Sequence, residues 1–151
     1  MQPNTMSKEE QAHQTYLNIA REMATLSSAE RAKVGAILVK DNNIIAEGYN
    51  GTPHGFDNVC EYYDPYINFS YTKPEVLHAE TNAITKIARS TRSSDGSTLY
   101  VTTAPCFECS KLIIQAGITQ VIYQDDYIDD GLRLLNKAGI KTRKLAHEKT
   151  V

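Results

Sequence analysis

A histidine, a glutamate and a pair of cysteines are the residues of this sequence best suited to chemistry. His78 and Glu80 lie two positions apart in the segment HAE, and Cys106 and Cys109 form a Cys-x-x-Cys pair in PCFEC. Zinc binds imidazole nitrogen and thiolate sulfur, and a catalytic zinc site has three protein ligands and a fourth position for water. The sequence therefore predicts that His78, Cys106 and Cys109 hold one zinc ion, whose bound water becomes a nucleophile.

Glu80 is expected to act on that water rather than to bind the metal. It lies within one helical turn of His78, so it can face the open coordination position. There it would take a proton from the water, deliver it to a ring nitrogen and protonate the departing amine. The pattern H-x-E followed by P-C-x-x-C is the signature of zinc deaminases that act on nucleobases. The pattern therefore predicts a hydrolytic deaminase.

Two other interpretations of the cysteine pair stay open. A Cys-x-x-Cys pair that follows a strand and begins a helix is also typical of thioredoxin-like redox proteins, although that role leaves His78 and Glu80 unexplained. A structural zinc site would need a fourth protein ligand, and the remaining cysteine is Cys60. Zinc content and thiol protection would separate the metal interpretations from the redox one.

The segments that carry these motifs alternate between helical and extended patterns. A capping box of Ser7 and Glu10 begins an amphipathic helix that ends near Leu26, and KVGAILVK and IIAEGYN form a hairpin. Spacing and glycines then predict a helix in HAETNAITKIAR, a strand in TLYVTT, a helix in CSKLIIQAG, a strand in TQVIYQ, a helix near 131–138 and a strand in IKTRKLA. Both motifs therefore fall at the start of predicted helices.

This order, α-β-β-α-β-α-β-α-β, predicts an α/β fold with three layers, in which a mixed five-stranded sheet has helices on both faces. The 151 residues are predicted to form one domain, 1–151. Segment 51–75 contains three prolines and many aromatic residues but no steady period. We expect it to be an ordered insertion, since so long a stretch without structure is uncommon.

Composition narrows the classes of partner. The net charge is −2 and no block of five Lys or Arg occurs, so a small ligand is favoured over a nucleic acid. No apolar run reaches the roughly 18 residues of a membrane span, and the N-terminal segment lacks the pattern of a signal peptide. Three cysteines are an odd number for a disulfide framework. A cytoplasmic protein without a membrane partner is expected.

The segments HAETNAI, PCFECSKLIIQAGI and GYNGTPHG together give the sequence a family resemblance. From about residue 17 to residue 145 it resembles the deoxycytidylate deaminases of the cytidine deaminase-like superfamily. The resemblance implies a cytidine deaminase-like fold and the hydrolysis of dCMP to dUMP and ammonia, a reaction that supplies dUMP for thymidylate synthesis. Alternatives are a related zinc deaminase acting on dCTP, on a free cytidine nucleoside or on a tRNA or single-stranded base, and a non-catalytic nucleotide-binding regulatory module.

The resemblance also implies residues that bind the substrate. Arg31 is the first candidate for the phosphate and Lys33 the second, with Tyr127 near the same group. The alternative for these three is an ordinary solvated surface. Further substrate residues beside the motifs would be Ala79, Thr103, Ala104 and Pro105.

The block GYNG is expected to serve both substrate and effectors. Asn50 would hydrogen-bond the sugar, and Gly48 and Gly51 would let the backbone approach the nucleotide, unless these glycines only serve the hairpin end. Relatives are commonly homohexamers that are activated by dCTP and inhibited by dTTP, with Mg²⁺ accompanying the triphosphate. Gly48, Tyr49, Asn50, Gly51 and Arg89 match positions associated with that regulation.

One departure from the family concerns a second metal. Some phage relatives hold a structural zinc around the insertion, with a histidine two places before the catalytic one. Val76 occupies that place here, and Cys60 and His54 are the plausible remnants of such a site. We therefore expect one zinc ion in each chain.

Overall fold

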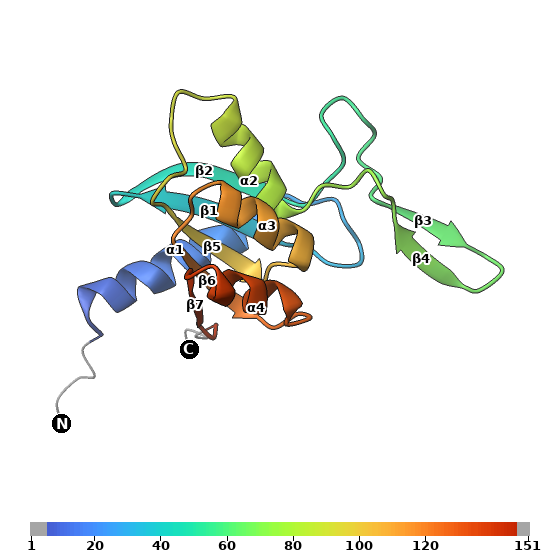
Figure 1. Cartoon of the computed structure of the whole chain (residues 1–151). Coiled ribbons are helices and arrows are strands. Elements are labelled where there is room, and N and C mark those ends of the chain that lie inside the picture. Colours follow the sequence, from blue (N-terminus) through green and yellow to red (C-terminus); the bar gives the residue numbers. More distant parts are fainter. Residues whose placement is uncertain (1–5, 148–151) are drawn as a thin grey trace.

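The computed structural model describes residues 6–147, which form four helices and seven strands (Figure 1). The helices are α1 (Lys8–Ala24), α2 (Ala79–Ala88), α3 (Phe107–Gln115) and α4 (Asp130–Lys137). The strands are β1 (Gly35–Lys40), β2 (Asn43–Tyr49), β3 (Glu61–Asp64), β4 (Phe69–Thr72), β5 (Thr98–Thr103), β6 (Gln120–Asp125) and β7 (Lys141–Lys144).

The main sheet has five strands in the order β2-β1-β5-β6-β7. β1 pairs antiparallel with β2 and β5, whereas β6 pairs parallel with β5 on one side and with β7 on the other. The turn between β1 and β2 contains Asp41 and Asn42, whose φ angles of 50° and 62° suit a two-residue hairpin turn. The predicted mixed five-stranded sheet is confirmed.

Alternate residues of each strand face opposite sides of the sheet, and each side has its own core. On one face Ile37, Tyr100 and Ile122 pack against Leu17 and Ala20 of α1. The other face is covered by α2, α3 and α4, whose buried members are Ala79, Ala83, Ile87, Ile113 and Leu135. The predicted three-layer arrangement is confirmed (Figure 1).

The helix ends follow the local signals in the sequence. The Ser7 hydroxyl accepts a hydrogen bond from the Glu10 amide at 3.1 Å, as the capping box predicts. The Glu10 side chain instead pairs with Arg143 at 2.6 Å, so α1 is joined to β7. Gly117 and Gly139, at φ angles of 77° and 85°, follow α3 and α4 in the left-handed conformation that commonly ends a helix.

The predicted element order is wrong in the insertion, where two strands were missed. β3 and β4 form an antiparallel hairpin and a separate two-stranded sheet, which projects from the body of the molecule (Figure 1). The strands have four residues each, too few to show a clear alternation of apolar and polar side chains. Stacking of Tyr62 on Tyr71, with ring centroids 5.4 Å apart, stabilises the pair across the strands.

No helix within residues 6–147 combines the length and the apolar character needed to cross a membrane.

Gly48 lets β2 and α2 pack at backbone distance. A Cβ atom at Gly48 would lie 2.4 Å from the Ala79 carbonyl oxygen and 2.7 Å from the Ala83 amide nitrogen. Both atoms belong to the backbone of α2, so only a shift of the helix could relieve the clash. Because α2 begins directly after His78, this packing also fixes the start of the predicted metal motif.

We predict that Gly48→Ala lowers the free energy of unfolding by about 1–3 kcal/mol, as overpacking of a tight interface does. Gly51→Ala is the matched control, because a Cβ at Gly51 meets no atom within 4 Å. Its unfolding free energy should stay within about 0.5 kcal/mol of the parent value. Urea denaturation of the two variants checks this, and equal losses of stability would contradict the assigned packing role.

Candidate active site

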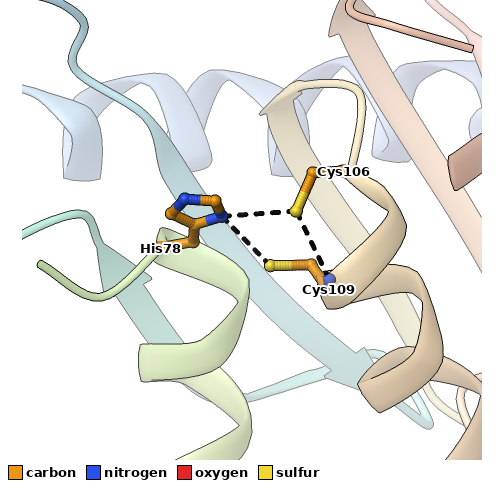
Figure 2. A group of neighbouring side chains, drawn as sticks. All are labelled: His78, Cys106 and Cys109. Atoms are coloured by element: carbon orange, nitrogen blue, oxygen red, sulfur yellow. Dashed lines mark hydrogen bonds between the residues drawn. The ribbon is translucent and has the colours of Figure 1, made fainter. Parts of the chain in front are cut away.

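The predicted metal ligands lie together where α2 and α3 begin (Figure 2). His78 is the N-cap residue of α2, and Cys106 is the N-cap residue of α3. The His78 Nδ1 atom lies 3.3 Å from the Cys109 Sγ atom and 3.5 Å from the Cys106 Sγ atom. The three ligand atoms lie within 4.8 Å of one another.

These distances and donor types fit zinc. When a nitrogen at about 2.1 Å and a sulfur at about 2.3 Å bind the same zinc at a tetrahedral angle, the nitrogen and the sulfur lie about 3.5 Å apart. One nitrogen and two sulfurs leave a fourth corner for a non-protein ligand, as in catalytic sites. Among the described residues, this cluster contains no fourth protein ligand, and Glu80 is not part of it.

The two helix starts are held in place by local hydrogen bonds and by close packing. The Cys109 amide donates to the Cys106 sulfur at 3.4 Å, an interaction that favours a thiolate at the positive end of α3. α4 packs on the segment before α3, since a Cβ at Gly131 would lie 2.2 Å from the Pro105 carbonyl oxygen. The cysteine pair is therefore fixed from within its helix and from the neighbouring one.

The mutual contacts shift the pKa values of the three ligands. Hydrogen bonds from the Cys109 thiol and from His78 lower the pKa of Cys106 to about 4. The hydrogen bond to Cys106, together with burial, raises the pKa of Cys109. The hydrogen bond to Cys106 also raises the pKa of His78. Metal binding needs both thiolates and a neutral imidazole, so it would release protons from this cluster.

Glu80 is the second residue of α2, within its first turn, and is 4% exposed. Burial is the main cause that raises the pKa of its carboxyl group. Glu80 nevertheless reaches a cavity of about 330 Å³ that also contacts His78 and Cys106. A buried carboxyl beside an open ligand cluster is suited to holding and transferring a proton inside this cavity.

Most of the predicted substrate residues line this same cavity, and two do not. Arg31, Asn50 and Tyr127 form part of the wall together with Ala79, Thr103 and Ala104. Lys33 is exposed and Pro105 is fully buried, and neither belongs to the lining.

Asn50 has a structural task at this wall. Its side-chain oxygen accepts from the Val34 amide at 2.9 Å, and its side-chain nitrogen donates to the Ala32 carbonyl at 2.8 Å. These bonds hold the segment between α1 and β1 against the end of β2. The amide group retains a free donor hydrogen and a free acceptor lone pair for a ligand.

The predicted effector residues do not form one cluster within the chain. Gly48 packs on α2, and the Tyr49 carbonyl accepts a hydrogen bond from Asn82 of that helix at 2.7 Å. Gly51 pairs through its backbone with Leu77. Arg89 caps the far end of α2, at the opposite end from the metal ligands.

Sequence reasoning missed Glu61, which also lines the cavity. Its carboxylate accepts hydrogen bonds from the backbone amides of Glu30 and Arg31 at 3.0 Å each. The contact depends on a hairpin that meets a loop thirty residues earlier in the chain. No local pattern around a single glutamate could have indicated it.

Cys60 is buried and lies with its sulfur 3.6 Å from the Ser28 hydroxyl, outside the ligand cluster. The structural-zinc interpretation, in which Cys60 supplies a fourth ligand, therefore lacks support. His78, within 3.5 Å of both paired sulfurs, counts against a redox pair.

A three-layer fold whose two helix starts carry H-x-E and P-C-x-x-C defines the zinc-dependent deaminase class. The family model for the cytidine and deoxycytidylate deaminase zinc-binding region matches residues 10–125. The chain belongs to this family.

Solved and curated relatives agree with that assignment. One solved relative is dCMP deaminase from the cyanophage S-TIM5, whose crystal structure is in complex with dCMP and dUMP. Its sequence is 43% identical to this chain, and the two structures superpose with a TM-score of 0.84. The match covers 93% of this chain and 100% of the phage protein. Deoxycytidylate deaminase of Homo sapiens is 40% identical, over 85% of this chain and 76% of the human protein. Deoxycytidylate deaminase of Saccharomyces cerevisiae is 33% identical, over 87% of this chain. The chain spans 44% of the yeast relative's length.

We predict that the purified chain binds about one zinc ion and that Cys106→Ser abolishes stoichiometric binding, because a catalytic site has only three protein ligands. Cys60→Ser is the matched control and should keep its zinc. Elemental analysis measures the metal, and alkylation of the thiols before and after chelation reports their protection. Zinc loss in Cys60→Ser would instead indicate a site with four protein ligands.

Proposed function

We propose that this chain catalyses the hydrolytic deamination of dCMP to dUMP and ammonia, a reaction that supplies dUMP for dTMP synthesis. The observation that carries the proposal is that His78 and Cys106 of the ligand cluster line one cavity together with Glu80. The relatives named above are dCMP deaminases, and one of them was crystallised with both dCMP and dUMP. Their names support the choice of substrate.

The residues of the cavity divide the reaction between them. A zinc ion held by the three ligands would supply Lewis acidity that lowers the pKa of a coordinated water. Glu80 takes a proton from the attacking water and passes it to a ring nitrogen, while the water oxygen bonds to C4 of cytosine. Glu80 then takes the remaining water proton from the new C4 hydroxyl and transfers it to the amino group, the carbon–nitrogen bond breaks as the C4 carbonyl forms, and ammonia leaves.

Other lining residues of the cavity suit the rest of the nucleotide. We assign the 5′-phosphate to Arg31, with the Tyr127 hydroxyl beside it, since both line the cavity and both side chains can donate hydrogen bonds to an anion. Lys33 is exposed away from the lining and is the weaker candidate. Asn50 is assigned to the sugar through its unused hydrogen-bonding positions, and the short residues Ala79, Thr103 and Ala104 leave room for the base.

Regulation and assembly complete the proposal. We infer activation by dCTP, inhibition by dTTP, Mg²⁺ bound with the triphosphate, and a homohexamer of single-domain chains acting in the cytoplasm. The support is the resemblance of the GYNG block and of Arg89 to the family. Arg89 lies at the C-terminal end of α2, whereas Gly48 packs near the start of this helix and Gly51 pairs with Leu77 just before it. An effector that uses both Arg89 and GYNG would therefore require more than one chain or a long contact along the helix.

Glu80→Gln should keep its zinc and lose activity, because the amide preserves the shape of the side chain but carries no transferable proton. We expect kcat to fall by about 10²- to 10⁴-fold. Glu75→Gln makes the same chemical change at an exposed position and should leave kcat unchanged. Steady-state kinetics with a zinc assay checks both, and near-normal turnover by Glu80→Gln would remove Glu80 from the mechanism.

Release of ammonia from dCMP, dCTP, CMP, deoxycytidine and a tRNA tests the assigned substrate. We expect dCMP to be preferred over deoxycytidine by roughly ten-fold or more in kcat/KM, the worth of a charge-assisted hydrogen bond to phosphate. Each substrate is measured with and without dCTP or dTTP. A higher kcat/KM for any other member would refute the dCMP assignment, and rates unmoved by dCTP would refute its role as activator.

A further inference from the structure

The β3–β4 hairpin contributes directly to the cavity wall. Glu61 at the start of β3 and Thr72 at the end of β4 are paired partners in the hairpin, and both line the cavity. Arg31, which comes from the segment between α1 and β1, lines the same cavity, and its guanidinium lies beside Thr72 of this hairpin. The insertion therefore meets the cavity at Arg31, which is the one arginine or lysine of the wall among residues 6–147.

Glu61 fixes the backbone from which Arg31 extends. Glu61 is 9% exposed, and its carboxylate accepts hydrogen bonds from two consecutive amides, those of Glu30 and Arg31. Hydrogen bonds to a buried carboxylate are short and strong compared with those between neutral groups. These hydrogen bonds fix the backbone of residues 30–31 against the hairpin. Both carboxylate oxygens of Glu61 are then occupied by backbone amides.

The Arg31 guanidinium is restrained by the same hairpin. Its central carbon lies 5.1 Å from the centroid of the Phe69 ring, and Nη1 lies 3.5 Å from the Thr72 hydroxyl. Among the ion pairs found within residues 6–147, none includes Arg31. An aromatic face and a hydroxyl hold the cation without neutralising it, so most of its five donor hydrogens stay available to an anion.

We propose that the β3–β4 hairpin makes this site specific for a nucleoside monophosphate, because Glu61, Phe69 and Thr72 position Arg31 over the cavity to bind the 5′-phosphate. The inference rests on the proposed function and adds the positioning residues for that same site. A preorganised arginine binds phosphate without losing the freedom of a long side chain on binding. The expected signature is therefore an effect on substrates that carry phosphate and on no others.

Phe69→Leu is the first test, because it removes the aromatic face but keeps an apolar side chain at a position that is 44% exposed. We expect KM for dCMP to rise about two- to five-fold, the worth of a cation–π contact near the surface. The value of kcat and the kcat/KM for deoxycytidine, which lacks phosphate, should not change. Tyr66→Leu is the matched control, an aromatic residue of the same hairpin that is 97% exposed, and should match the parent for both substrates.

Coupling to Arg31 separates positioning from a general structural role. Arg31→Ala should raise KM for dCMP, and Phe69→Leu added to it should cause no further change, because the two act through one interaction. Glu61→Gln and Thr72→Val should each raise KM for dCMP as well. Equal losses on dCMP and deoxycytidine, or an additive double variant, would overturn the inference. So would an unchanged KM in every hairpin variant.

Product binding keeps this test apart from that of the proposed function. Titration calorimetry compares the affinity of the zinc-loaded protein for dUMP and for deoxyuridine, and needs no turnover. Failure of the parent protein to deaminate dCMP would refute the proposed function. In that case, weaker binding of dUMP in Phe69→Leu, with deoxyuridine unaffected, would still support the role of the hairpin. Equal affinities of the parent protein for dUMP and deoxyuridine would overturn it.

Discussion

The convergence of two helix starts on one point is the constraint on which this structure depends. α2 supplies His78 and α3 supplies both cysteines, so the ligand geometry is only as good as the placement of these two helices. Each is fixed by backbone contact where a side chain would intrude. Gly48 brings β2 onto α2, and Gly131 brings α4 onto the segment before Cys106. The sheet and its helices thus act as a rigid frame for a few atoms.

The lining of the cavity comes from two kinds of segment. The metal ligands and the buried Glu80 carboxyl come from helices packed on the sheet. Other lining residues come from the segment between α1 and β1, which Asn50 holds through hydrogen bonds to Val34 and Ala32. Because that segment has no regular structure of its own, its shape depends on side chains from other elements. One such side chain is Glu61 of the insertion, which holds the Glu30 and Arg31 amides.

Local patterns were enough to predict the frame. The strands of the main sheet and the four helices arose from periodicity and capping signals that lie within each element, and Gly117 and Gly139 mark the ends of α3 and α4 as expected. The hairpin of the insertion was missed, because four-residue strands show too little alternation to be recognised. Its cross-strand contact between Tyr62 and Tyr71 exists only once the strands have paired.

The candidate metal ligands could be predicted from local patterns in the sequence. Cys106 and Cys109 have the spacing of a helix start, His78 completes the set of three donors, and Glu80 lies two residues after it. Only the tertiary structure decided which further residues share the cavity. Glu61 lines the cavity although no motif includes it, and Lys33 does not line it. Asn50 and Gly48 also make structural contacts that the GYNG motif does not predict. The physical reason is that ligand spacing within one helical turn is a local property. A cavity wall depends instead on contacts between segments that fold together from distant parts of the chain.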